Sequence, residues 1–257
     1  MSAEHAMLRI EGLRKNYGAV AALQGVDIEV RRGEVMGLIG PNGSGKSTLF
    51  DCCTGLQRSD AGRVLLKGVD ITGWPMNRIA REGRFLRSFQ KTVVFPTLDS
   101  EENLVLAGQM SRFPNVLSTF WVGPSAKKRI KALRERAREL IEVTGLSRVA
   151  HLPAGNMSGG QQKLLQFASM LMPEPELILL DEPLAGINPV LIEKVIQCIE
   201  HANQKLGVTF VVIEHNTDVL MNLSHRVVVL HQGAKLADAT PEEVVRNQEV
   251  IEAYLGG

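Results

Sequence analysis

The sequence predicts an α/β fold built on a mostly parallel sheet and interrupted by a helical segment. Three observations support this fold class. Short apolar runs of strand length alternate with helical stretches in the N-terminal and C-terminal parts of the chain. A glycine-rich turn at residues 40–48 joins one of these runs to a helix. Between the two parts, residues 101–172 follow an almost entirely helical pattern.

The predicted elements follow one another in a regular order. The expected strands are residues 7–11, 26–30, 34–39, 63–67, 177–180, 208–213 and 226–230. The expected helices are residues 47–54, 127–142, 158–172, 189–206 and 216–223. Several strands are apolar along their whole length, which is typical of parallel strands covered by helices on both faces.

Composition and length limit what the protein can be. The chain of 257 residues suffices for one large α/β domain or a core with a smaller lobe. Its 29 basic and 28 acidic residues give a net charge of +1, which does not indicate a nucleic-acid partner. The cysteines Cys52, Cys53 and Cys198 lack metal-ligand spacing, and the adjacent pair fits a reducing compartment. We find neither a secretion signal nor an apolar run long enough to span a membrane, so a role at a membrane requires docking onto a spanning partner.

Residues 40–48 read Gly-Pro-Asn-Gly-Ser-Gly-Lys-Ser-Thr and match the phosphate-loop pattern G-x-x-x-x-G-K-[ST] between a strand and a helix. Its glycines let backbone N–H groups approach phosphate oxygens, Lys46 brings charge to the outer phosphates, and Ser47 offers a hydroxyl to Mg²⁺. A fortuitous glycine-rich turn is the alternative, and the strand–helix setting argues against it. The sequence predicts that Mg-ATP contacts Gly40, Pro41, Asn42, Gly43, Ser44, Gly45, Lys46, Ser47 and Thr48.

Two carboxylates end the apolar run at residues 177–180. A buried parallel strand would deliver them to its carboxyl end, where open α/β sheets bind ligands. We expect Asp181 to hold Mg²⁺. Glu182 points the other way on a strand and is the expected general base. A solvated acidic turn is the alternative, which the upstream phosphate loop disfavours.

Residues 158–162, Ser-Gly-Gly-Gln-Gln, open a predicted helix. Locally, Ser158 is an N-cap and the glycines form a loop. The same features also build a second anion site from a hydroxyl, free backbone N–H groups and a helix N-terminus.

This motif resembles the Leu-Ser-Gly-Gly-Gln signature of the ATP-binding cassette (ABC) ATPases, with Met157 in place of leucine. The resemblance covers nearly the whole chain. It implies a P-loop NTPase (RecA-like) fold with an N-terminal antiparallel β subdomain, and one domain, residues 1–257, with an inserted helical subdomain at 92–172. It also implies that ATP bound to a second ABC ATPase chain is contacted by Ser158, Gly159, Gly160 and Gln161.

Further single residues fit the same family in the same order. Tyr17 matches the aromatic residue that stacks on adenine. Gln90 matches the glutamine that links Mg²⁺ to the helical lobe and takes part in catalysis. His215 matches the histidine that contacts the γ-phosphate. Asn188, in the dimer-contacting loop at 184–188, replaces the acid most common there.

Within the family, the sequence is most similar to ATPases of branched-chain amino-acid importers. Four features support this resemblance: Glu-Pro-Leu-Ala-Gly-Ile-Asn-Pro at 182–189, Ile-Glu-His at 213–215, the long segment between Gln90 and the signature, and Glu-Ala-Tyr-Leu-Gly at 252–256. It implies a dimer of ATPase chains on transmembrane permease subunits at the cytoplasmic face of the inner or plasma membrane. A periplasmic or extracellular solute-binding protein would serve them indirectly, without nucleic acid. Importers of amides or urea share these features.

Two other functions stay open at this point. One is the ATPase of a lipid or lipopolysaccharide exporter. The other is a soluble ABC ATPase that acts on nucleic acid, although the sequence lacks the long coiled coil or zinc module of that class. Residues 108–124 hold two phenylalanines and a tryptophan with little charge. They predict a docking surface for the membrane partner, with a packed lobe core as the alternative.

Overall fold

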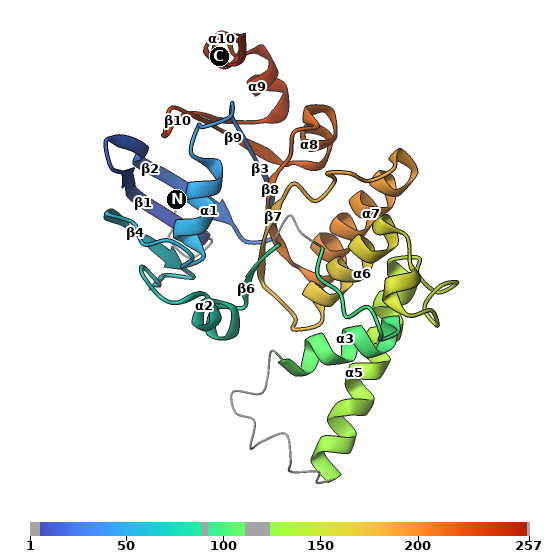
Figure 1. Ribbon diagram of the computed structural model, residues 1–257. Coiled ribbons are helices and arrows are strands. Elements are labelled where there is room, and N and C mark those ends of the chain that lie inside the picture. Colours follow the sequence, from blue (N-terminus) through green and yellow to red (C-terminus); the bar gives the residue numbers. More distant parts are fainter. Residues whose placement is uncertain (1–5, 89–91, 111–123, 256–257) are drawn as a thin grey trace. The chain divides into compact units, whose positions relative to one another are not determined.

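The computed structural model describes residues 6–88, 92–110 and 124–255 (Figure 1). The chain divides into two compact units. The first contains residues 1–88, 176–183 and 203–257, and the second contains residues 89–175 and 184–202. Both sheets belong to the first unit.

The N-terminal sheet is antiparallel, with strand order β2-β1-β4-β5, which confirms the expected antiparallel subdomain. Its strands are β1 Ala6–Tyr17, β2 Val20–Arg31, β4 Ala61–Leu66 and β5 Val69–Asp70. The first two are longer than predicted, because β1 changes register between Ile10 and Leu13. At this irregularity Gly12 has a φ of 56° and its N–H donates to Asp27. The interruption breaks the alternation of apolar residues, so the sequence pattern marks only part of each strand.

The second sheet has the order β10-β9-β3-β8-β7-β6 and is parallel except for β10, which is antiparallel to β9. Its strands are β3 Val35–Ile39, β6 Phe85–Arg87, β7 Leu177–Asp181, β8 Thr209–Ile213, β9 Arg226–His231 and β10 Ala234–Ala239. Every residue of β3, β7 and β8 is buried, which explains their uninterrupted apolar runs. The short β6 and the partly polar β10 carry no such run, and the sequence did not predict β10.

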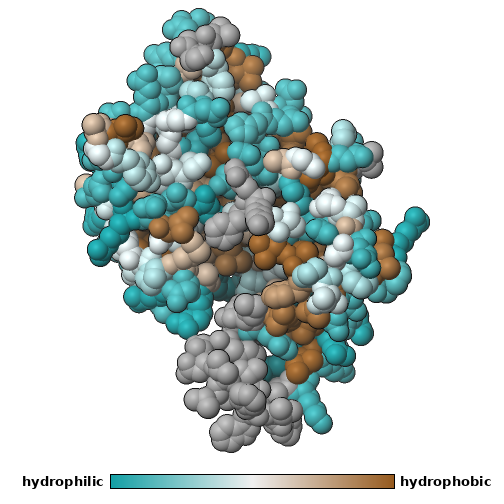
Figure 2. All heavy atoms as spheres, in the orientation of Figure 1, coloured by the Kyte–Doolittle hydropathy of each residue, from teal (hydrophilic) through white to brown (hydrophobic). Residues whose placement is uncertain are grey.

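Five helices of the described chain lie in the first unit: α1 Lys46–Cys53, α2 Met76–Gly83, α8 Thr217–Leu223, α9 Pro241–Arg246 and α10 Gln248–Leu255. Helices α2, α9 and α10 were not predicted from the sequence. A start signal for α9 was present, because Thr240 and Glu243 form a capping box around Pro241. Three aromatic side chains, Phe50, Phe85 and Phe210, are fully buried in this unit. The face of the unit drawn in Figure 2 is largely hydrophilic to neutral.

The second unit is helical. Its elements are α3 Ser100–Met110, α5 Pro124–Val143, the 3-10 helix η2 Ala154–Asn156, α6 Gly159–Leu171, and α7 Pro189–Leu206 up to Ala202. One face of α5 is apolar and buried, with Leu133, Ala137, Leu140 and Ile141 inside the unit, whereas Ile130 nearer the start of the helix is 37% exposed. Residues 144–158 form turns and η2 rather than a continuous helix. Across the described ranges, no helix combines the length and apolar character that crossing a membrane requires.

A buried arginine in the first unit forms ion pairs at the amino ends of β3 and β9. Arg226 donates to Glu34 at 2.8 Å and also pairs with Asp238. The side chains of Arg226 and Glu34 are only 13% and 8% exposed, so each charge depends on its partner.

Replacing Arg226 by Met should lower the free energy of unfolding by about 3 kcal/mol, because the Glu34 carboxylate would stay buried without its cation. Urea denaturation measures this loss. The matched control is Arg63→Met, whose ion pair with Glu11 is exposed and should contribute no more than about 1 kcal/mol. Equal losses in the two variants would contradict the structural role of Arg226.

Candidate nucleotide site

Residues 40–48 connect β3 to α1, as the sequence predicted. Gly45 is the N-cap of α1 with a φ of 103°, and no side chain within the described residues caps this helix. The uncapped N–H groups at the helix start are therefore available to an anion. A Cβ atom on Gly40 would lie 2.1 Å from the carbonyl oxygen of Leu230, and one on Gly45 would lie 2.6 Å from that of Ala22. Only glycine fits these two positions.

Lys46 folds back over the loop. Its ammonium group donates to the carbonyl oxygens of Gly40 at 2.7 Å and Pro41 at 3.0 Å. Burial lowers the pKa of Lys46, and the negative charges of Glu182 and Asp181 partly oppose this shift. The cation is thus placed close to both carboxylates.

Three other residues of the loop carry hydroxyl groups, and they differ in their exposure to solvent. Ser44 is 2% exposed, and its Oγ has no hydrogen-bond partner among the described residues. Ser47, at the start of α1, is exposed to solvent, and Thr48 is half-buried. An orphaned buried hydroxyl, an uncapped helix and a lysine together fit a bound phosphate chain.

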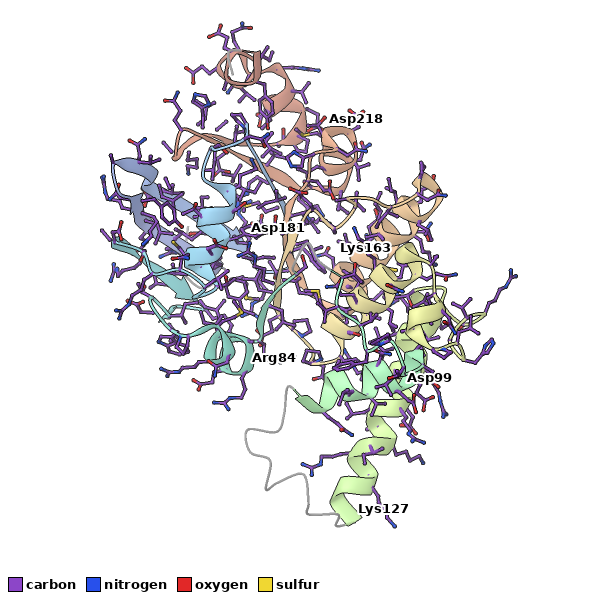
Figure 3. All side chains as sticks on the ribbon, viewed as in Figure 1. Arg84, Asp99, Lys127, Lys163, Asp181 and Asp218 are labelled. Atoms are coloured by element: carbon purple, nitrogen blue, oxygen red, sulfur yellow. The ribbon has the colours of Figure 1, made fainter. Side chains whose placement is uncertain are left out.

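Asp181 ends β7 beside α1, as Figure 3 shows. Its Oδ2 accepts a hydrogen bond of 2.8 Å from Arg87 of β6. The other amino group of Arg87 donates to Asp51 of α1. Burial lowers the pKa of Arg87, but its hydrogen bonds to Asp51 and Asp181 outweigh this and raise the pKa overall. The backbone N–H of Asp181 donates to the Ser88 hydroxyl at 2.9 Å.

Glu182 and His215 lie together at the same edge of the sheet. Oε1 of Glu182 and Nε2 of His215 are 2.9 Å apart, a hydrogen-bonding distance. The expectation that Glu182 continues the strand is wrong, because β7 ends at Asp181 and Glu182 has a φ of 50°. Its direction is therefore set by a left-handed turn, a conformation that is costly for a non-glycine residue and concentrates at functional sites. The backbone N–H of Glu182 donates to the carbonyl oxygen of Ile213 at 2.9 Å.

Tyr17 lies at the end of β1 and is 45% exposed. The Lys15 ammonium group lies 5.6 Å from the centre of this ring. An exposed tyrosine of this kind can accept a base in a stacked arrangement. Gln90 lies outside the described residues, as does most of the predicted docking segment at 108–124.

The signature motif opens α6 in the second unit. Ser158 is the N-cap, and it forms a capping box with Gln161: the hydroxyl accepts from the Gln161 N–H, and the Gln161 side chain accepts from the Ser158 N–H. This confirms the predicted N-cap. Gly159 has open space around it, whereas a Cβ atom on Gly160 would lie 2.1 Å from the Leu191 side chain. The preceding Met157 is 5% exposed, so it fills an apolar position as leucine would.

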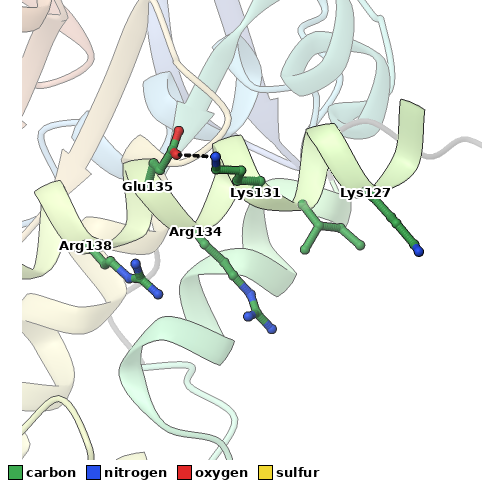
Figure 4. A pocket seen from close by; sticks show the side chains of 6 residues that line it. Lys127, Lys131, Arg134, Glu135 and Arg138 are labelled. Carbon is green, nitrogen blue, oxygen red and sulfur yellow. Dashed lines mark ion pairs between the residues drawn. The ribbon is translucent and has the colours of Figure 1, made fainter. Parts of the chain in front are cut away.

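Asn188 directly precedes α7, and its carbonyl accepts from the N–H groups of Leu191 and Ile192. A surface depression along α5 is unrelated to these motifs. It is lined by Lys127, Ile130, Lys131, Arg134, Glu135 and Arg138 (Figure 4). Lys131 pairs there with Glu135 on the same helix, as on a solvated helix face.

Comparison with known proteins decides the family. Residues 23–185 match the family model described as "ABC transporter". The chain belongs to the ABC transporter family. As an ABC ATPase, it binds nucleotide and couples ATP hydrolysis to transport. Residues 234–257 match a second model, described as "Branched-chain amino acid ATP-binding cassette transporter".

Relatives of this ABC ATPase extend over almost its whole length. It is 36% identical to the "High-affinity branched-chain amino acid transport ATP-binding protein BraF" of Pseudomonas aeruginosa, covering 97% of this chain and 98% of that protein. It is 34% identical to the LivG protein of the same description from Escherichia coli, with the same coverage. A crystal structure of the ADP conformation of an ABC transporter's ATP-binding cassette superposes with a TM-score of 0.82 at 32% identity, covering 98% of this chain and 99% of that one.

The nucleotide site also contains residues that were not predicted from the sequence. Arg87 forms hydrogen bonds with both Asp51 and Asp181, so it links these two carboxylates. The N–H of Gly233, in the turn between β9 and β10, donates to the Ser44 carbonyl at 3.1 Å. None of these residues belongs to a motif, and only the tertiary contacts of the folded unit reveal them.

Replacing Gly40 by Ala should weaken ATP binding by at least about tenfold, because the new Cβ atom would collide with the Leu230 carbonyl and displace the loop. Isothermal calorimetry with ATP measures the affinity. Gly33→Ala is the matched control, since Gly33 also has a positive φ but has open space around its Cα atom. It should cost about 1 kcal/mol of stability and leave ATP affinity unchanged. Normal affinity in Gly40→Ala would contradict the geometry of the loop.

Proposed function

We propose that this ABC ATPase powers a membrane importer for branched-chain amino acids or related small amide and amino-acid solutes. The observation that supports this proposal is the match of residues 234–257 to a branched-chain amino-acid transporter model. The named relatives, BraF and LivG, are described as ATP-binding proteins of such transport. They favour import over the lipid-exporter and nucleic-acid alternatives.

The nucleotide in this proposal is Mg-ATP, held by residues 40–48 with Tyr17 stacked on adenine. Ser47, Asp181 and Gln90 would hold the metal, since hydroxyl, carboxylate and amide oxygens are the ligands that Mg²⁺ prefers. When bound, the ion supplies positive charge to the outer phosphates. Lys46 adds a second positive charge by releasing the Gly40 and Pro41 carbonyls that it contacts in this structure.

Glu182 is proposed as the general base of hydrolysis. It accepts a proton from the attacking water, whose oxygen bonds to the γ-phosphorus while the bond to the bridging oxygen of ADP breaks. His215 holds the Glu182 carboxylate through their 2.9 Å contact and is the proposed partner of the γ-phosphate. The left-handed backbone of Glu182 fixes the position from which the carboxylate acts.

The signature motif is proposed to act on the ATP of a second ABC ATPase chain. The Ser158 hydroxyl accepts a hydrogen bond as the N-cap of α6, so its own hydrogen is still free to donate to a phosphate oxygen. Gly159 leaves open space at the helix start, whereas Gly160 packs against Leu191, and Gln161 follows in the capping box. Because only a closed dimer would bring this motif to a nucleotide, ATP would favour closure.

The remaining partners follow from the same proposal. Residues 92–172 would form the helical subdomain that receives the permease subunits, with 108–124 as the docking segment. The chain would then lie at the cytoplasmic face of the membrane through those subunits. A solute-binding protein outside would select the solute, because the ATPase does not touch it.

The test is a vesicle that contains the complete transporter with its permease subunits and solute-binding protein. With ATP inside, the wild-type protein should drive uptake of labelled leucine. Glu182→Gln should reduce ATP hydrolysis by about 10²- to 10⁴-fold and stop uptake, because the general base is lost. ATP binding should persist, and gel filtration with Mg-ATP should show a stable dimer.

The control is Asp218→Asn, which neutralises an exposed carboxylate on α8 and should leave uptake and hydrolysis unchanged. A fully active, monomeric Glu182→Gln protein would contradict the assigned base. Active ATP hydrolysis without leucine, isoleucine or valine uptake would contradict the solute class while leaving the ATPase assignment in place.

A further inference from the structure

One buried arginine joins three elements of the ATPase site. The Arg87 side chain on β6 is 8% exposed. It donates to Asp181 at the end of β7 and to Asp51 on α1, the helix that follows the phosphate loop. Its Nε is buried and has no hydrogen-bond partner in the described part of the chain. All polar contacts shown for this guanidinium are therefore with the two carboxylates.

The charges around the site explain why a cation is needed there. Asp181 and Asp51 are 7% and 23% exposed, so little water solvates their carboxylates. With Glu182 they bring three negative charges, whereas Lys46 and Arg87 bring two positive ones. The site therefore has a formal charge of −1. Without Arg87, two poorly solvated carboxylates would repel each other and move apart.

Among the described residues, the contact of Arg87 with Asp181 engages only one of the two carboxylate oxygens. Arg87 occupies Oδ2, and no hydrogen bond joins Oδ1 to any residue in the described ranges. The planar guanidinium fork of Arg87 spans the two carboxylates with one hydrogen bond to each, so it fixes Oδ2 of Asp181 relative to Asp51. The neighbouring Ser88 adds to this, because its hydroxyl accepts from the Asp181 N–H at 2.9 Å.

We propose that Arg87 is a positioning residue of the ATPase site, which orients Asp181 for the metal ion and couples that carboxylate to the phosphate-loop helix through Asp51. This inference rests on the proposed binding of Mg-ATP. Arg87 does not touch the nucleotide; it acts through the two carboxylates that it holds. Its loss therefore reduces the gain in nucleotide affinity that Mg²⁺ provides, rather than affinity for the nucleotide itself.

A purely stabilising role is the competing explanation, and the chain contains a matched control for it. Arg226 is also buried and also bridges two carboxylates, those of Glu34 and Asp238, but at the amino ends of the strands. Arg226→Met therefore removes a similar bridge from the end of the sheet that carries no phosphate loop. The two variants separate lost stability from lost metal coupling.

The experiment measures ATP affinity by calorimetry, once with EDTA and once with Mg²⁺. In Arg87→Met, the ratio of the two affinities should fall at least about tenfold below the wild-type ratio, a change of about 1.4 kcal/mol. The affinity in EDTA should stay within about twofold, because Lys46 and the loop are intact. Steady-state hydrolysis should show a KM for Mg-ATP raised by a similar factor, together with a lower kcat. Arg226→Met should keep the wild-type ratio.

Arg87→Lys and Asp51→Asn extend the test if Arg87→Met does not fold. Lysine restores the charge but cannot reproduce the fork, and Asp51→Asn keeps the contact with Asp181 while weakening the link to α1. Each should lower the ratio by a smaller factor, about threefold. A wild-type ratio in all variants that fold would overturn the inference. A wild-type protein that does not bind Mg-ATP would instead contradict the proposed function.

Discussion

The close approach of backbone to backbone at the phosphate loop is the constraint on which the rest of the site depends. The Cα atoms of Gly40 and Gly45 lie so near the carbonyls of Leu230 and Ala22 that neither position has room for a side chain. The loop is thereby held between β9 and β2, and the Gly233 N–H adds a hydrogen bond to the Ser44 carbonyl. Held in this way, α1 presents an uncapped N-terminus at the carboxyl end of β3.

The positions of the phosphate loop and α1 also determine which charged side chains meet at the site. The carboxylates of Asp181 and Glu182 come from one strand end, and the cations come from two other elements. Lys46 satisfies loop carbonyls, and Arg87 satisfies the acids of β7 and α1. These charges are largely removed from water, so their pairing decides which groups stay ionised and where they point. A phosphate chain and a metal ion can then enter a site in which Asp181 and Asp51 already share the cation of Arg87.

The sequence predicted the parts of the fold whose patterns are local. Strands β3, β7 and β8 and helix α7 are long or uniformly apolar, and the phosphate loop and signature are contiguous motifs. The bulged β1 lost its alternation, and the three-residue β6 is too short to produce a period. Arg87 could not be recognised as part of the site, because its two partners lie 36 and 94 residues away along the chain. The turn at Glu182 was not predicted, because no sequence pattern marks a glutamate whose backbone adopts the left-handed conformation.

The most direct measurement is a crystal structure of the protein with Mg²⁺ and a non-hydrolysable ATP analogue. We expect phosphate density inside the loop at 40–48, with the Lys46 ammonium group moved from the Gly40 carbonyl to a phosphate oxygen and the metal ion near Ser47 and Asp181. The Ser44 hydroxyl, which lacks a partner among the described residues, should face the phosphates. Nucleotide bound elsewhere, or Lys46 still on the Gly40 carbonyl beside a bound nucleotide, would contradict the proposed nucleotide site at residues 40–48.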